Sequence, residues 1–252
     1  MPVNDVHADR DRAESFGSMA EMYDRHRPSY PDDLISDLVA LEPAAVLDVG
    51  CGTGKAAVAL IEHGVSVLGL EPDPRMAEVS RRHGVPVEVA DFESWQDAGR
   101  RFDLITCAQA WHWIDPEQGL RRTTELLRPG GTLARFWNYH VLDEQVVEAF
   151  DAVYREHAPD ADGLGHDPSA SQDHDPFAGR EGFVWTETRT YPWERELTAD
   201  AWVALVATYS DHQRLGRERL ASLQGALHET ITRLGGTVRA HGGAYVRLAR
   251  RA

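Results

Sequence analysis

Apolar and polar positions between residues 44 and 139 follow a pattern that predicts strands alternating with helices. Short apolar runs are followed by stretches of helical periodicity, and these lead into further apolar runs. The expected strands are 44–50, 65–71, 85–91, 102–110 and 131–139, and the expected helices are 55–64, 74–84 and 116–131. Because the apolar runs are nearly continuous, we expect a doubly wound α/β fold whose parallel sheet is covered on both faces.

The flanking segments complete the predicted fold. Residues 11–41 predict two helices, because Pro28 and Pro31 in RPSYP interrupt the helical pattern. The later elements are a helix at 143–157, strands at 181–198 and 242–251, and two helices between those strands at 199–211 and 216–234. We therefore expect a Rossmann-like sheet of seven strands with a helical cap, in which residues 181–195 and 242–250 form an antiparallel last hairpin.

These elements predict a single domain over residues 1–252. Its expected parts are an N-terminal helical arm (1–42), a cofactor-binding core (43–140), cap or lid insertions with part of the sheet (141–235) and the last strand (236–252). Residues 159–179 contain five aspartates and three prolines but no lysine or arginine. Loops of this length are uncommon unless they act as lids or are disordered, so we expect one of these two states.

Composition narrows the class of protein. The 252 residues include 26 basic and 41 acidic side chains, a net charge of −15, and 42% hydrophobic residues. An acidic protein repels nucleic acid, so we expect no nucleic-acid partner. No run approaches the roughly 18 apolar residues of a membrane span. We expect a cytoplasmic monomer or homodimer that does not bind membranes, with Cys51 and Cys107 buried and reduced.

The most informative stretch is VLDVGCGTG (46–54), a strand that runs into a glycine-rich turn and a helix. A dinucleotide-binding fingerprint needs glycine at position 55, which is Lys55. A phosphate-binding P-loop needs glycine and Ser/Thr where the chain has Val49 and Ala56. A tight turn without a ligand would also use glycines. Glu71, however, closes the next strand 21 residues after Gly50, where a carboxylate can accept both hydroxyls of a ribose.

Six motifs in order give the chain a resemblance to a known family. They are YDRHRPSYP (23–31), LDVGCGTG (47–54), LEPDPRM (70–76), ADFESW (90–95), FDLITCAQAWHWID (102–115) and LLRPGGTL (126–133). With them the chain resembles class I S-adenosylmethionine-dependent methyltransferases of the small-molecule type 11 group, and it is similar to trans-aconitate methyltransferases. The resemblance covers residues 15–140 well and 180–250 loosely.

The resemblance implies a binding site for S-adenosylmethionine, with S-adenosylhomocysteine as the product. Glu71 would hold the ribose, Asp91 and the backbone of Phe92 the adenine, and Arg27 the methionine carboxylate, although Asp91 could instead be a helix N-cap and Arg27 a surface residue. The full expected set is Tyr23, Arg27, Asp48, Gly50, Cys51, Gly52, Thr53, Gly54, Glu71, Pro72, Met76, Asp91, Phe92, Ala108, Gln109 and Ala110.

The substrate side is less defined by the sequence. His112 in AQAWHW is the candidate base, because an imidazole transfers protons near neutral pH; it could equally pack between two tryptophans. Residues expected to line the substrate pocket are Tyr30, Trp111, Trp113, Asn138, His140, Trp193 and Tyr209, although such aromatic residues more commonly fill a core. The histidines 157, 166 and 174 have no metal-ligand spacing, so no metal is expected.

The expected function is transfer of a methyl group from S-adenosylmethionine to an O, N or C nucleophile of a small molecule. Two alternatives stay open, because a fold does not fix a function. The chain could bind the same cofactor while catalysing another reaction, such as a cyclisation or a decarboxylation. It could also be a non-catalytic cofactor-binding module.

Overall fold

A computed structural model describes residues 15–161 and 177–252, and within these ranges seven strands form one sheet in the order β3-β2-β1-β4-β5-β7-β6. The strands are β1 (Val46–Val49), β2 (Val67–Glu71), β3 (Val87–Val89), β4 (Phe102–Ala108), β5 (Leu127–Leu142), β6 (Phe183–Thr198) and β7 (Thr237–Arg251). Strands β1 to β5 are parallel, and β7 is antiparallel to both β5 and β6. The doubly wound sheet with its antiparallel end is therefore confirmed.

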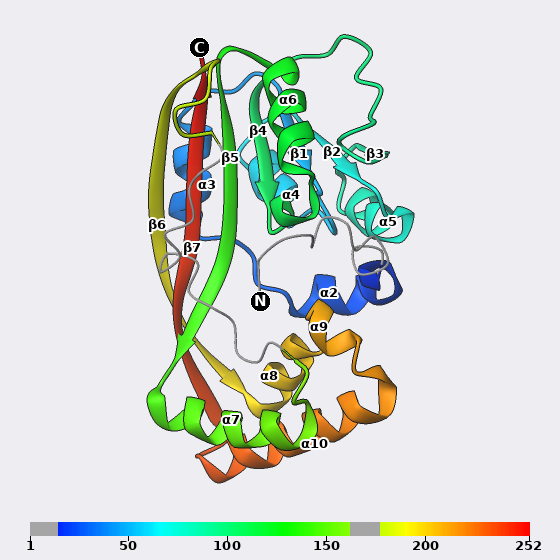
Figure 1. Ribbon diagram of the computed structural model, residues 1–252, viewed down its shortest axis with the longest axis vertical. Helices are drawn as coiled ribbons and strands as arrows, with labels where there is room; N and C mark the ends of the chain where they lie inside the picture. Colours follow the sequence, from blue (N-terminus) through cyan, green and yellow to red (C-terminus); the bar gives the residue numbers. More distant parts are fainter. Residues whose placement is uncertain (1–14, 162–176) are drawn as a thin grey trace.

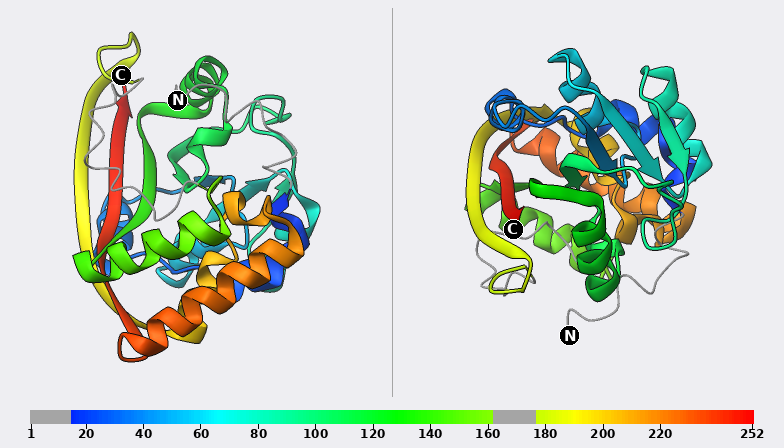
Figure 2. Two further views of the ribbon diagram at one scale, coloured as in Figure 1. Left: turned by 60° about the horizontal axis from the view of Figure 1, so that its bottom comes forward. Right: turned by 90° about the horizontal axis from the view of Figure 1, so that it is seen from above.

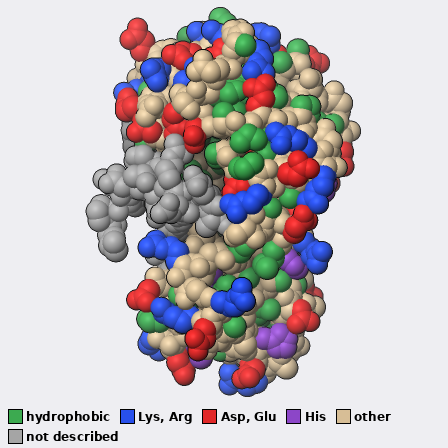
Figure 3. Space-filling view, turned by 90° about the vertical axis from the view of Figure 1, so that its right-hand side faces the viewer, with side chains coloured by type: hydrophobic (Ala, Val, Ile, Leu, Met, Phe, Trp, Pro, Cys, Tyr) green, Lys and Arg blue, Asp and Glu red, His purple; other side chains and the backbone are tan. Residues whose placement is uncertain are grey.

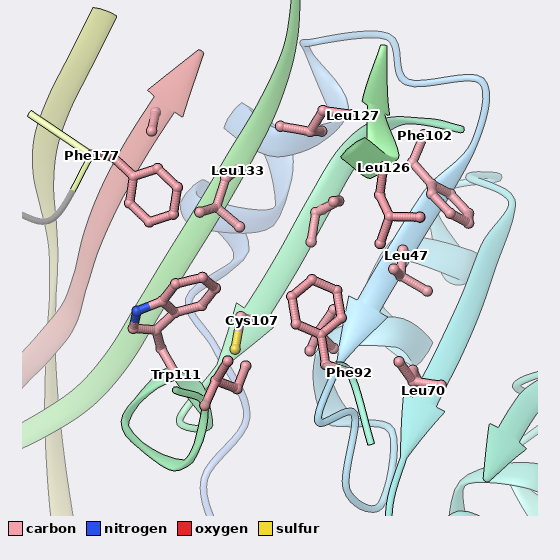
Figure 4. Packing of buried hydrophobic residues seen from close by; sticks show 14 of the residues in the cluster. Leu47, Leu70, Phe92, Phe102, Cys107, Trp111, Leu126, Leu127, Leu133 and Phe177 are labelled. Atoms are coloured by element: carbon pink, nitrogen blue, oxygen red, sulfur yellow. The ribbon is translucent and has the colours of Figure 1, made fainter. Parts of the chain in front are cut away.

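Helices cover both faces of the sheet. Figure 1 shows α6 (Pro116–Leu126) in front of it and α3 (Asp32–Val39) and α4 (Lys55–Glu62) behind it. The two faces carry separate apolar clusters: Leu47 and Ile105 belong to the one that includes Leu126 of α6, and Val46 and Leu104 belong to the one that includes α3 and α4. Neighbouring strand residues thus point to opposite faces, which explains the nearly continuous apolar runs. Figure 4 shows the α6 side of this core.

The arm has the predicted two-helix form. A short 3-10 helix (Ser15–Met19) and α2 (Ala20–His26) precede RPSYP, and α3 follows it. Helix α2 packs against α5 (Pro74–Arg82), where Met76 and Val79 of α5 form a small cluster with Ala20. Arg82 of α5 is also ion-paired with Glu21 of α2. These contacts place the arm beside the carboxyl ends of the parallel strands (Figure 1).

The long strands β5, β6 and β7 extend beyond the parallel strands and carry a second group of helices. These are α7 (Glu144–His157), α8 (Ala199–Val206), α9 (Ser210–Gln213) and α10 (Gly216–Arg233). Leu142 and Val238 on the strand extensions pack with Trp202 of α8 and Leu227 of α10 in one buried cluster. Figure 2 shows α7 and α10 side by side across this end of the molecule. The α2 helix lies between this group and the parallel strands.

Several predicted boundaries were wrong. The helix expected at 116–131 ends at Leu126, because Leu127 is already extended and pairs with Phe102 of β4. The helix expected at 199–211 is divided into α8 and α9. The last strand begins at Thr237 rather than 242, directly after Gly235 and Gly236, whose left-handed φ angles end α10. Most of the acidic segment 159–179 lies outside the described residues.

The surface in Figure 3 carries basic and acidic side chains interspersed with each other. Among the described helices, none combines the length and apolarity needed to cross a bilayer. The division into arm, core and cap, the cytoplasmic location and the oligomeric state stay predictions.

Candidate active site

Two cavities lie next to each other at the carboxyl ends of the parallel strands. The first, here the Glu71 cavity, encloses about 780 Å³. Its lining residues are Tyr23, Val49, Gly50, Gly52, Leu70, Glu71, Pro72, Met76, Ala90, Asp91, Phe92, Glu93, Ala108, Gln109, Ala110, Trp113 and Ile114. Ligands of open α/β sheets bind at this edge, where helix N-termini and strand ends meet. The motifs after β1, β2, β3 and β4 are thus brought together.

The second cavity, here the Arg195 cavity, encloses about 850 Å³ and lies toward the helices on the long strands. It shares Tyr23, Gly50, Gly52, Ala108 and Gln109 with the Glu71 cavity, so the two adjoin along β1 and β4. Its other lining residues are His26, Arg27, Pro28, Tyr30, Cys51, Thr53, Lys55, Ala56, Asn138, Tyr139, His140, Trp193, Arg195, Leu197, Leu205, Tyr209 and Ala240.

The turn after β1 forms the floor between the two cavities. Gly50 and Gly52 have left-handed φ angles of 63° and 56°, which glycine adopts without a steric penalty. A β-carbon on Gly50 would lie 2.5 Å from the Ala110 β-carbon. The backbone therefore passes close to β4, and a side chain at position 50 would fill space beside the Glu71 cavity.

Glu71 ends β2 at the wall of its cavity and is 7% exposed. Its Oε2 accepts a hydrogen bond from Gly52 N at 2.9 Å, and its Oε1 accepts one from Asp73 N at 3.0 Å. These bonds fix the orientation of the carboxylate and leave each oxygen a second lone pair. Burial raises the pKa of Glu71 to about 7, although the Asp73 and Gly52 N–H groups act in the opposite direction.

Asp48 and Gly54 lie below the turn and line neither cavity. Asp48 is fully buried; its Oδ1 accepts a hydrogen bond from Thr106 Oγ1 at 2.7 Å, and its Oδ2 has no partner among the described residues. Burial raises the pKa of Asp48 to about 7. A β-carbon on Gly54 would lie 2.5 Å from Ser80 Oγ of α5. Both residues therefore contact the elements behind the turn, and their predicted part in cofactor binding stays a prediction.

The arm contributes Tyr23 and Arg27 to the cavities. Arg27 Nη2 donates a hydrogen bond to Thr208 O at 3.0 Å, and its guanidinium lies over the rings of Tyr23 and Tyr209, 5.3 and 4.5 Å from their centroids. Its Nε is buried and has no partner in the described part of the chain. Arg27 therefore lines the Arg195 cavity and joins the arm to the segment between α8 and α9.

Most of the residues expected on the substrate side line the Arg195 cavity. Tyr30 packs edge-on against Phe136, with ring centroids 4.7 Å apart, and Tyr209 lies under Arg27. His140 packs edge-on against Trp202. Burial lowers the pKa of His140 to about 4, and the nearby Arg27 charge lowers it further in the same direction. His140 is therefore a neutral imidazole at physiological pH.

Trp111, Trp113 and His112 do not line the Arg195 cavity. Trp111 begins a 3-10 helix (Trp111–Trp113) and is buried in the core on the α6 side, against Phe177, as Figure 4 shows. Trp113 lines the Glu71 cavity instead. His112 is exposed, packs on the Trp113 ring, and lines a third, outer cavity with Arg27 and Asp211. The short helix therefore directs the three side chains to different places: Trp111 to the core, Trp113 to the Glu71 cavity and His112 to the outer cavity.

The sequence interpretation missed Lys55 and Arg195. Lys55 follows the glycine turn directly, and its Nζ donates a hydrogen bond to Asp24 O at 2.7 Å. Arg195 lies two residues after Trp193 on β6, so the two share a face of the strand. The alternation of this strand was the signal that could have identified Arg195.

The metal prediction concerned three histidines. His157 is hydrogen-bonded to Ser222 Oγ, at 3.0 Å from its Nδ1, whereas residues 166 and 174 lie outside the described ranges. Within those ranges, no group of three or more His, Cys, Asp or Glu side chains is arranged to hold a metal ion.

Comparison with known proteins agrees with this geometry. Residues 46–131 match a family model described as a methyltransferase domain. An uncharacterised methyltransferase of Mycobacterium tuberculosis is 35% identical over 208 residues, which are 80% of this chain and 79% of the relative. An uncharacterised methyltransferase-like protein of Schizosaccharomyces pombe is 25% identical over 85% of this chain and 86% of its own length.

A solved structure from Anaeromyxobacter dehalogenans, assigned as a type II methyltransferase, superposes with a TM-score of 0.64 and 24% identity, covering 89% of this chain and 97% of that protein. It is evidence for the fold alone. A strand-end site with a glycine turn and a closing carboxylate on a doubly wound sheet defines the class of nucleotide-cofactor enzymes. With these relatives, the chain belongs to the class I S-adenosylmethionine-dependent methyltransferases. The likeness to the trans-aconitate subgroup stays a prediction.

Proposed function

We propose that the Glu71 cavity binds S-adenosylmethionine and that the adjoining Arg195 cavity holds a small-molecule methyl acceptor. The observation that most supports this is the orientation of the Glu71 carboxylate by Gly52 N and Asp73 N at the cavity wall. A carboxylate held in this way can accept hydrogen bonds from two adjacent hydroxyls. The order of the cavities along β1 and β4 supports a nucleoside in the first and an acceptor in the second.

The residues of the Glu71 cavity fit the parts of this cofactor. Glu71 would hold the ribose hydroxyls. Asp91 would accept from the adenine amino group, and Phe92 N would donate to the ring. Met76 and Pro72 would contact one face of the adenine. The ligand would have space beside the turn because residue 50 is a glycine, which has no side chain.

The methionine end of the cofactor would lie where the two cavities meet. Arg27 would pair with its carboxylate, because a guanidinium matches a planar anion in charge and geometry. The buried, unpartnered Arg27 Nε fits this role. Tyr23, which lines both cavities, would place an aromatic ring near the sulfonium, a favourable contact for a positive charge.

When bound, S-adenosylmethionine supplies a methyl group that is already activated for displacement. The protein then has to align the acceptor and exclude water. The partly buried aromatic rings of Tyr23, Tyr30 and Tyr209 would exclude water from the Arg195 cavity. His112 lines the outer cavity, and its role as a base stays a prediction.

Titration calorimetry with S-adenosylhomocysteine tests this proposal without a known acceptor. We expect binding of one ligand per chain, and no competition from NAD, since the turn lacks the third glycine of the dinucleotide fingerprint. Binding of NAD in preference to S-adenosylhomocysteine would contradict the proposal. When Glu71 is replaced, substitution of Glu78, an exposed carboxylate on α5, is the control that shows the effect of losing one negative charge elsewhere.

A further inference from the structure

The Arg195 cavity differs in charge from the rest of this acidic protein. Its described lining residues include the cations Arg27, Lys55 and Arg195 and no aspartate or glutamate. The whole chain has 41 acidic and 26 basic residues. A cavity lined in this way has a positive potential, which concentrates anions and repels cations.

Arg195 is one of the cations that line this cavity. It is half-buried, its guanidinium lies 4.7 Å from the Trp193 ring centroid, and its Nη2 donates a long hydrogen bond, 3.5 Å, to Ser29 O. In the described ranges no carboxylate pairs with it, and burial lowers its pKa. Arg189, on the same strand, contrasts with it, because Arg189 forms ion pairs with Glu187 and Asp37.

Several polar atoms in the cavity are also without partners. Ten buried side-chain nitrogen and oxygen atoms have no hydrogen-bond partner among the described residues. Five of them belong to residues that line this cavity: Arg27 Nε, Thr53 Oγ1, Asn138 Oδ1, His140 Nε2 and Trp193 Nε1. A buried polar atom is costly when it is unpaired. A polar ligand that pairs with these atoms would remove that cost.

The sheet register brings the relevant side chains to one place. Gly242 of β7 lies opposite both His140 of β5 and Trp193 of β6, and Ala240 lies opposite Arg195. A β-carbon on Gly242 would lie 2.7 Å from the Trp193 ring. The small residues on β7 therefore leave room for the Trp193 ring, and Trp193 and Arg195 together form one wall of the cavity.

We propose that the methyl acceptor is a small organic anion whose charged group is bound by the Arg195 guanidinium and the Trp193 Nε1–H. This inference rests on the proposed function, in which the Arg195 cavity holds the acceptor. Both groups are hydrogen-bond donors, and a charged donor beside a carboxylate forms a strong pair. A protonated amine would meet Arg27, Lys55 and Arg195 with no carboxylate to balance its charge. The cavity therefore selects acids over amines.

The test uses protein saturated with S-adenosylhomocysteine and three probes of similar size, benzoate, benzyl alcohol and benzylamine, titrated by calorimetry. We expect benzoate to bind at least tenfold more tightly than the other two. Arg195→Gln should weaken benzoate at least tenfold, and Arg195→Lys should restore part of the loss. Arg189→Gln, which removes an ion-paired arginine from the same strand, should leave benzoate binding unchanged.

Other outcomes would overturn the inference. No detectable benzoate binding, or equal binding of all three probes, would show that the cavity does not select anions. Weaker S-adenosylhomocysteine binding in Arg195→Gln would show that Arg195 binds the carboxylate of the cofactor rather than an anionic acceptor. If the wild type fails to bind S-adenosylhomocysteine at all, the proposed function fails first. Titration of S-adenosylhomocysteine before any probe is added distinguishes this failure from a failure of the anion inference alone.

Discussion

The guanidinium of Arg27 lies 4.5 Å from the centroid of the Tyr209 ring, and through this contact the N-terminal arm is joined to the helices on the long strands. The hydrogen bond from Arg27 to Thr208 O strengthens the same connection. Because these groups line the Arg195 cavity, the arm closes the site at the point where cofactor and acceptor would meet.

Arg27→Ala should therefore weaken S-adenosylhomocysteine by about tenfold or more, since a hydrogen bond to a charged group contributes about 1.5–3 kcal/mol. The fold should persist, because the apolar cores do not include this side chain. Arg27→Lys should recover less than half of the lost binding free energy, since an ammonium cannot reproduce the planar pairing. Calorimetry measures the affinity and circular dichroism checks the fold.

The arm itself should gain protection when ligand binds. We expect hydrogen exchange in residues 20–31 to slow on addition of S-adenosylhomocysteine, because an enzyme with a closed site must open to admit its substrate. Protection that is equally strong with and without ligand would show that the arm is a permanent wall, and access would then have to occur elsewhere.

Glu71→Ala should weaken S-adenosylhomocysteine by about 1.5–3 kcal/mol, the range for loss of a charged hydrogen-bond acceptor. The variant also removes the acceptor for Gly52 N and Asp73 N, so it should lose some stability as well. Glu88→Ala, on the next strand, is the control for Glu71→Ala. It removes a carboxylate that is paired with Arg100 and lies away from both cavities. Unchanged affinity in Glu71→Ala would mean that another residue holds the ribose.

The elements around these residues show what the sequence could predict. The glycine turn, Glu71 and Asp91 were placed correctly at one edge of the sheet, because strand–helix alternation and right-handed crossovers leave few other topologies. Local patterning could not show that Trp111 faces the core while Trp113 faces the Glu71 cavity. That difference depends on a three-residue helix whose orientation is set by packing against Gly119 and Phe177.

The acceptor side was less predictable for a related reason. Its residues come from the arm, from α4 and from the long strands, which are distant in sequence and meet only in the folded chain. His140 and Trp193 lie opposite the same residue, Gly242, through the β5-β7-β6 register. A single sequence contains no signal for that register beyond the alternation within each strand.

The buried carboxyl of Asp48 should make stability depend on pH in an unusual direction. Burial raises its pKa from 3.8 to about 7. Between these values the folded protein keeps a proton that the unfolded chain has released, so the free energy of unfolding falls as the pH rises. The full effect is on the order of 4 kcal/mol, at about 1.4 kcal/mol per pKa unit.

Urea unfolding of the wild type and of Asp48→Asn at pH 5 and pH 8 measures this effect. Asn cannot titrate, so the wild type should lose stability relative to the variant as the pH rises. A difference between the two proteins that is the same at both pH values would contradict the prediction.

His140 should contribute with the opposite sign. Its pKa is lowered to about 4, first by burial and then by Arg27. Between about 4 and its ordinary value the unfolded chain binds the proton and the folded protein does not, so this residue makes stability rise with pH. In a pH titration followed by NMR, the imidazole signal that disappears in His140→Gln should stay neutral down to about pH 5. A midpoint near the ordinary value would show that the ring is accessible to water.

Two glycines with similar backbone angles separate the steric requirement of the site from backbone strain. Gly50 and Gly64 have φ angles of 63° and 80°, so alanine at either position adopts an unfavourable conformation that costs about 1–2 kcal/mol. A β-carbon on Gly64 meets nothing within 4 Å, whereas one on Gly50 lies 2.5 Å from the Ala110 β-carbon. Both variants should therefore lose stability, and Gly50→Ala should lose more.

Only Gly50→Ala should also lose S-adenosylhomocysteine binding, because relief of the clash has to move either the turn or the end of β4, and both line the Glu71 cavity. Calorimetry on both variants, with thermal melts as the record of stability, tests this. Equal affinity in the two would mean that the ligand does not lie against the turn, and the cofactor would then have to be placed away from the glycines.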